Sequence, residues 1–111
     1  MLPKKERLSR LEFNRFFSAG KRHHFPFVQV IVSPHEFLHA SVVISKKIAK
    51  RAVVRNKIRR RIYDIVRHYR SAEGLRGVFI FVVKPAISTL SYATLKSELN
   101  SALKTIAKKN S

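Results

Sequence analysis

The sequence predicts one α+β domain over residues 1–111, in which a small mixed β-sheet of three to four strands packs against three helices. Three observations predict this class. Apolar residues recur at helical spacing in three separate segments, short runs rich in β-branched residues lie between those segments, and 111 residues suffice for one hydrophobic core. The expected order is helix, two or three strands, helix, strand, helix, because strands and helices that alternate in this way form layered α/β structures.

The first helix is expected over residues 10–19. Ser9 and Glu12 have the spacing of a capping box, and Gly20 suits the residue that follows a helix end. Three aromatic residues share one side of this helix, namely Phe13, Phe16 and Phe17. The simplest interpretation of each ring is packing against the core.

Three runs have the composition of strands. Residues 25–32 and 39–45 are rich in β-branched and aromatic residues, and a turn-like stretch over 33–38 joins them, which predicts an antiparallel pair. Residues 78–83 form a continuous apolar run, which is typical of a strand covered on both faces. We therefore expect residues 78–83 at or near the centre of the sheet.

Two further helices complete the prediction. One spans residues 53–69, and because strands precede and follow it, it implies a parallel crossover. The other begins near Ser91 and is amphipathic, so it is expected to lie on the sheet. The apolar stripe of the first consists of Ile58, Ile62, Ile65, Val66 and Tyr69, and that of the second of Tyr92, Leu95, Leu99, Leu103 and Ile106.

The net charge is the strongest indication of a partner. Lys and Arg number 24 against 6 Asp and Glu, which gives +18. An excess of this size favours binding to a polyanion. Most of the basic residues interleave with apolar periodicity instead of forming a tail, so nucleic acid is favoured over a membrane surface. The chain has no cysteine, no apolar run long enough to span a bilayer and no signal-peptide pattern, so we expect a cytoplasmic protein.

The basic residues are concentrated in residues 46–70, where Asp64 is the only acid. On a helical wheel one strip of the predicted helix carries Asn56, Arg60, Tyr63 and Arg67, with Arg55 and Arg59 beside it. Guanidinium groups bind phosphate in a bidentate manner and stack on bases, and Asn and Tyr add directional hydrogen bonds. This strip therefore predicts a surface that binds a phosphate backbone.

Catalysis by the protein itself is not predicted. Nucleases that use metals hold Mg²⁺ with closely placed carboxylates, whereas the six acids here are scattered over different predicted elements. The five histidines lie near predicted strand ends or surfaces, where such residues are more often structural. We expect no catalytic residue and no metal site in the protein.

Residues 45–60 resemble the signature of the bacterial ribonuclease P protein component, in which two lysines precede a helix that begins with an Arg-Asn-Arg pattern. Here the two lysines are Lys46 and Lys47, and the pattern reads Arg55-Asn56-Lys57. The likeness extends over nearly the whole chain, including the aromatic first helix that ends at Gly20 and the Lys84-Pro85-Ala86 run after the last strand. The family usually has a second Arg where Lys57 stands, so the charge is kept but the guanidinium fork is lost.

The resemblance implies a protein subunit that binds a large catalytic RNA and helps it remove the 5′ leader from precursor tRNA, broadening its substrate specificity. The RNA performs the hydrolysis and requires Mg²⁺, the protein holds no tightly bound cofactor, and one protein copy joins the RNA. The resemblance also implies a left-handed crossover, whereas general rules alone predict a right-handed one.

Two groups of binding residues follow from the charge pattern and the resemblance together. The surface for the RNA subunit comprises Lys46, Lys47, Lys50, Arg51, Arg55, Asn56, Lys57, Arg59, Arg60 and Arg67. The resemblance implies a leader-binding cleft made of Phe13, Phe17, Val28, Val30, Arg60 and Tyr63. The alternatives left open are a ribosomal or other structural RNA-binding protein, and a DNA-binding module, which would need a base-reading helix and usually a dimer.

Overall fold

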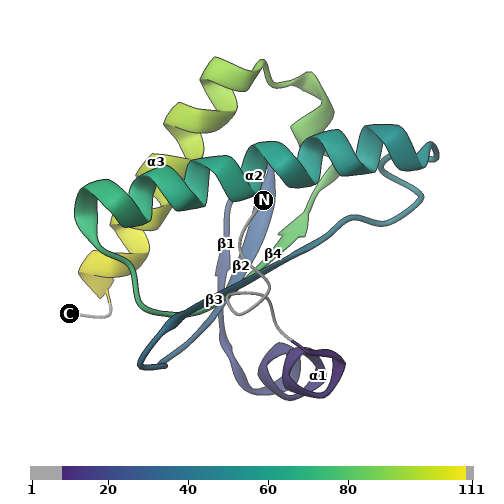
Figure 1. Ribbon diagram of the computed structural model, residues 1–111. Helices are drawn as coiled ribbons and strands as arrows, with labels where there is room; N and C mark the ends of the chain where they lie inside the picture. The colour runs from purple at the N-terminus through teal and green to yellow at the C-terminus, as the bar shows by residue number, and fades with distance from the viewer. Residues whose placement is uncertain (1–8, 110–111) are drawn as a thin grey trace.

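The computed structural model describes residues 9–109 and confirms an α+β fold (Figure 1). Three helices and a four-stranded sheet follow the expected order, with a short 3-10 helix before the last helix. The elements are α1 (Arg10–Ala19), β1 (Lys21–His24), β2 (Val28–Ser33), β3 (Leu38–Val43), α2 (Ala52–Glu73), β4 (Gly77–Val83), η2 (Pro85–Thr89) and α3 (Tyr92–Lys109).

The strands lie in the order β1-β2-β4-β3. The expected antiparallel pairing of the strands now seen as β2 and β3 is wrong, because β4 lies between them, antiparallel to β2 and parallel to β3. The expected central position of β4 is confirmed. Its apolar run has side chains to bury on both faces, and only an interior strand has both faces covered over its whole length.

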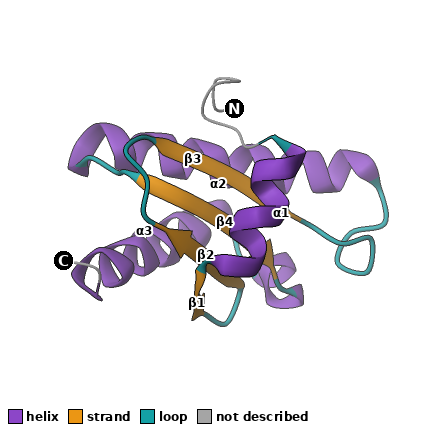
Figure 2. Ribbon diagram, turned by 90° about the horizontal axis from the view of Figure 1, so that it is seen from below, coloured by secondary structure: helices purple, strands orange, loops and turns teal. Residues whose placement is uncertain are grey.

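The connection from β3 through α2 to β4 is left-handed. Figures 1 and 2 together show this hand: seen from the side of α2 with the strands pointing up, β4 lies to the left of β3. The resemblance implied this hand, whereas the general rule for strand–helix–strand units gives the opposite one.

Helices cover both faces of the sheet. Figure 2 shows α1 crossing one face while α2 and α3 lie against the other. The larger core lies on the α2 and α3 side and includes Val30, Phe79 and Phe81 of the sheet. On the α1 side, Ile31, Val78 and Ile80 are fully buried, and the aromatic residues of α1 pack on them.

The capping box of α1 is confirmed. The Ser9 Oγ accepts a hydrogen bond from the Glu12 backbone N–H at 3.3 Å, and the Glu12 Oε1 accepts one from the Ser9 backbone N–H at 3.1 Å. The hydrogen bond from the Ser9 backbone holds the pKa of Glu12 below its ordinary value. These contacts fix the start of α1, and therefore the position of its aromatic side.

Gly20 ends α1 because two segments approach closely there. Its backbone is extended, with φ of −70°, so the position does not require glycine for its dihedral angles. A Cβ at Gly20 would instead collide with the side chain of Ile31 and lie 2.9 Å from the Phe16 carbonyl oxygen. Glycine thus allows α1 to lie directly on β2.

Replacing Gly20 by alanine should destabilise the protein by about 1–3 kcal/mol, the usual cost of overpacking a well-packed site. Urea denaturation of the purified protein measures the change. The control is Ser18→Ala, an exposed position on the same helix, which should stay within about 0.5 kcal/mol of wild type. Equal midpoints for Gly20→Ala and wild type would show that α1 can shift away from β2 at no cost.

Candidate nucleic-acid interface

The predicted basic residues gather at the N-terminal half of α2 and in the loop before it. Lys46, Lys47, Lys50 and Arg51 are exposed on residues 44–51, which we call the basic loop. On the first half of α2, the side chains of Asn56, Lys57 and Arg60 are exposed, and those of Arg55 and Arg59 are half-buried. The predicted Arg67 is also exposed, but it lies in the second half of the helix, 3.5 Å from the Asp64 carboxylate, so the structure does not bring it into this group. Figure 1 shows this end of α2 and the loop at the right of the molecule, where the chain turns back from β3.

Arg55 is bonded to the protein backbone. Its Nη1 donates to the carbonyl oxygens of Ala49 at 2.9 Å and Lys50 at 2.8 Å. Arg51, the N-cap residue of α2, makes no side-chain capping bond, whereas the Arg55 side chain ties the end of the basic loop to the first turn of the helix. The sequence pattern predicted Arg55 as an RNA contact, whereas these bonds indicate that it positions the loop cations.

Replacing Arg55 by alanine should therefore lower both stability and nucleic-acid affinity. Hydrogen bonds from a charged donor contribute about 1.5–3 kcal/mol, and their loss would free the basic loop from α2. The matched control is Lys57→Ala on the exposed side of the same helix turn, which should lower affinity and leave the urea midpoint unchanged. If Arg55→Ala also leaves the midpoint unchanged, Arg55 is an ordinary phosphate contact.

A hollow of about 430 Å³ lies on the first turns of α2, lined by Val53, Asn56, Arg59 and Arg60. Arg59 Nη1 donates to the Asn56 Oδ1 at 2.8 Å, which orients the amide and the guanidinium together. Val53 is 75% exposed, an unusual position for an apolar side chain, and it was not among the predicted binding residues. Its position outside the apolar stripe of α2 was the available signal.

The predicted cleft residues do not form one surface. Val28, Val30 and Tyr63 are 1%, 0% and 5% exposed and belong to the core between the sheet and the helices α2 and α3. Phe13 and Phe17 pack on the opposite face of the sheet. Successive side chains of a strand point to opposite faces of the sheet. The β2 residues that face α1 are therefore Gln29 and Ile31, each one position along the chain from the predicted Val28 and Val30.

One row of residues on the α1 side of the sheet is only partly covered. His24 pairs with Gln29, Gln29 with Val82, and Val82 with Val43, so these four side chains cross all the strands in register. His24 is exposed and the other three are half-buried, whereas Ile31 and Ile80 in the neighbouring row are fully buried. This open row lies at the end of β3, where the chain enters the basic loop.

Aromatic and polar side chains of neighbouring elements border the open row. The rings of Phe13 and Phe17 are stacked with centroids 5.4 Å apart, and the Arg22 guanidinium lies 5.0 Å from the Phe17 ring centroid. Arg22 also donates to the Phe17 carbonyl oxygen at 3.1 Å and to the Gln29 Oε1 at 3.3 Å. We call Phe13, Phe17, Arg22 and Gln29, together with Val43 and Val82, the aromatic surface. Half-exposed rings beside a cation are typical of sites for single-stranded nucleic acid.

Within residues 9–109, no group of three or more histidines and carboxylates has a geometry that could hold a metal ion. Glu12 is engaged in the α1 cap, and the Asp64 carboxylate lies 3.5 Å from the Arg67 guanidinium. None of the helices in this described part is both long and apolar enough to cross a membrane.

Comparisons with known proteins identify the family. The family model described as Ribonuclease P matches residues 2–107. Proteins named ribonuclease P protein component from Microcystis aeruginosa and Citrifermentans bemidjiense are 32% and 33% identical to this chain. The first alignment covers 92% of this chain and 91% of the relative, and the second covers 96% and 93%.

Solved structures give the same answer. A mutant of the Staphylococcus aureus RNase P protein with defective mRNA degradation activity superposes with a TM-score of 0.83 at 25% identity, over 95% of this chain and 90% of that one. The RNase P protein from Thermotoga maritima has the same fold, with a TM-score of 0.75 at 22% identity over 90% and 96% of the two chains. From the match over residues 2–107 and these relatives, the chain belongs to the ribonuclease P protein family.

Proposed function

We propose that this ribonuclease P protein component assists a catalytic RNA in removing the 5′ leader from precursor tRNA, as a monomer within a cytoplasmic holoenzyme. The observation that carries the proposal is the junction of two different surfaces at the end of β3. The basic loop and the N-terminal half of α2 are strongly cationic, and the aromatic surface beside them offers rings, an amide and a guanidinium.

The two surfaces suit two different RNA targets. Clustered Lys and Arg neutralise the phosphates of a structured RNA, which favours the basic loop and α2 as the site for the RNA subunit. Half-exposed rings stack on unpaired bases, which favours the aromatic surface as the site for a single-stranded leader. Because the open row ends where the basic loop begins, one protein can hold the ribozyme and guide the leader away from the cleavage point.

The protein's own residues supply binding and no chemical step in this proposal. The carboxylates of Glu12 and Asp64 have structural partners, and hydrolysis is assigned to the RNA with its Mg²⁺ ions. The protein instead lowers the repulsion between two polyanions, the ribozyme and its substrate, so that fewer metal ions are needed to bring them together.

Cleavage assays at low Mg²⁺ test the proposal. Adding the protein to ribonuclease P RNA should restore leader removal that the RNA alone performs poorly, and the protein without RNA should cleave nothing. RNA binding with no stimulation of cleavage would favour the alternative, a ribosomal or other structural RNA-binding protein. Cleavage by RNA-free protein that a single acid or histidine substitution abolishes would overturn the assignment of chemistry to the RNA.

A further inference from the structure

The end of the molecule opposite the basic loop carries a second hollow that the proposed function does not use. It has a volume of about 760 Å³, within the range of about 300–1,000 Å³ for ligand sites, and lies between the β2–β3 connection and the α2–β4 connection. Its lining residues are Glu36, Phe37, Leu38, His39, Arg70, Leu75 and Arg76. We call it the Phe37 hollow.

Phe37 is held in place by its backbone while its ring stays exposed. Its N–H donates to the His35 Nδ1 at 3.1 Å, and its carbonyl oxygen accepts from the Gly77 N–H at 3.3 Å. Phe37 is nevertheless 64% exposed, more than any other Phe or Tyr in residues 9–109. The ring also lies against the His35 ring, with centroids 6.4 Å apart. A fixed backbone with a largely exposed ring is a preorganised stacking platform, because binding of a planar ligand requires little further ordering of the protein.

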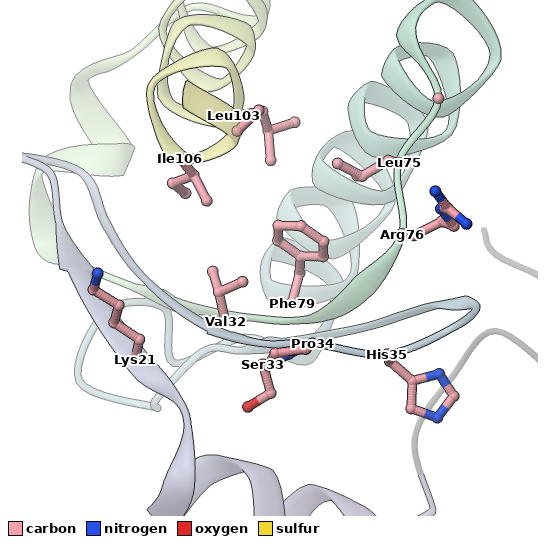
Figure 3. Close-up of a pocket in the computed structure, with 12 residues that line it drawn as sticks. Lys21, Val32, Ser33, Pro34, His35, Leu75, Arg76, Phe79, Leu103 and Ile106 are labelled. Atoms are coloured by element: carbon pink, nitrogen blue, oxygen red, sulfur yellow. The ribbon is translucent and has the colours of Figure 1, made fainter. Parts of the chain in front are cut away.

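Two guanidinium groups border the same hollow. Arg70 comes from the last turns of α2 and Arg76 from the loop before β4, and Glu36 is the only acid in the lining. Figure 3 shows the neighbouring cavity, into which Leu75 points beside Leu103, while the Arg76 side chain points away from it. Leu75 and Arg76 border both hollows, so this loop forms the wall between them.

We propose that the Phe37 hollow binds one nucleotide of a single-stranded RNA, with the base stacked on the Phe37 ring and the phosphate bound by Arg76. Base–aromatic stacking and guanidinium–phosphate pairing are the two interactions that recognise a nucleotide without regard to sequence. A net charge of +18 brings a polyanion to this surface and disfavours an apolar protein partner or a second copy of the chain.

The site is separate from the surfaces assigned above. Asn56 and Arg70, the α2 residue that lines the hollow, are 14 positions apart, so the hollow lies about 21 Å along the helix axis from the basic turns at the start of α2. Two RNA contacts at this separation would fix the direction of the protein on its RNA, which a single basic patch does not do. The inference rests on the proposed function for the presence of RNA but not for the identity of the leader surface.

The chain contains no tryptophan, so Phe37→Trp introduces a single tryptophan at the proposed stacking position, whose fluorescence can be excited selectively over that of the three tyrosines. The full-length protein is titrated with a short oligoadenylate, with the same length of abasic strand, and with adenosine monophosphate. We expect saturable quenching by oligoadenylate, none by the abasic strand, and weaker binding by about 10- to 100-fold when Arg76→Ala is added, as for loss of one charged contact. Displacement by adenosine monophosphate would show that a free nucleotide suffices, whereas no displacement would assign the site to an RNA strand.

The matched control is Ser97→Trp on the exposed side of α3, beside Glu98, where no quenching is expected. Equal quenching of the tryptophans at positions 37 and 97 would overturn the inference. So would quenching that is as strong with the abasic strand as with oligoadenylate, or that Arg76→Ala leaves unchanged. Quenching when wild-type protein, which has no tryptophan, is added in place of RNA would show that a second copy occupies the hollow and would overturn the inference. Leader removal is measured in parallel: normal stimulation with no quenching contradicts only the hollow, whereas quenching without stimulation contradicts only the proposed function.

Discussion

Binding to the ribonuclease P RNA should weaken by about 10²- to 10⁴-fold when the salt concentration rises from about 50 to about 200 mM. The basic loop and the N-terminal half of α2 present enough cations for about five to eight phosphates, and each neutralised phosphate releases condensed counterions. The logarithm of affinity should then fall with the logarithm of salt at a slope of about 4 to 7 in magnitude. Filter binding or fluorescence titration over a salt series measures this slope.

Two substitutions show whether the effect belongs to a defined site. Arg60→Ala, beside the Asn56–Arg59 pair, should weaken binding and reduce the slope by about one phosphate contact. Lys104→Ala removes an exposed charge from α3 and should change both quantities much less. Equal losses in the two variants, or a wild-type slope near 1, would indicate diffuse attraction without a site.

Replacing Phe17 by leucine should remove most of the preference of the holoenzyme for precursor over mature tRNA. Stacking contributes about 1–3 kcal/mol per base, so one or two engaged bases give a preference of about tenfold or more. Leucine keeps apolar packing against the buried sheet residues but offers no ring to a base or to the Arg22 guanidinium. Affinities for substrates with a full leader and with none, measured in wild type and variant, give the result.

Phe16 provides the matched control. It is also half-buried on α1, but its ring meets His35, with centroids 6.4 Å apart, and not the stacked pair beside the open row. Phe16→Leu should therefore alter stability about as much as Phe17→Leu and leave the leader preference intact. If the two variants lose affinity for both substrates equally, these rings are purely structural and the basic surface alone explains the protein's role.

Local signals predicted most of the elements, whereas strand order required the tertiary structure. The capping box placed α1 to the residue, and the continuous apolar run identified β4 as an interior strand. The pairing of β2 with β3 was the default for strands close in sequence, and it failed because β4 has more apolar surface to bury between them. Strand β1 was missed because Lys21–His24 is polar, and pairing with β2 holds it in the sheet.

The candidate site was predictable in its charge and less so in its geometry. Charge density alone located the basic residues at the start of α2, but it could not show that Arg55 is bonded to the loop backbone. Alternate side chains of β2 face α1, and these are Gln29 and Ile31. The prediction of Val28 and Val30 was wrong because their side chains point to the other face, into the core. Arg22 and Gln29 lie on β1 and β2, and which face of the sheet their side chains take depends on how these strands pair with their neighbours.

The position of β4 determines when the sheet can form during synthesis. β4 is the last strand to be synthesised and the one that joins β2 to β3, so the nascent chain cannot complete its sheet until residue 83 has left the exit tunnel. Until then β2 and β3 have no common partner and the cationic helix α2 is already made, next to ribosomal RNA. Long-range pairing of this kind slows folding and leaves apolar strands open to wrong contacts.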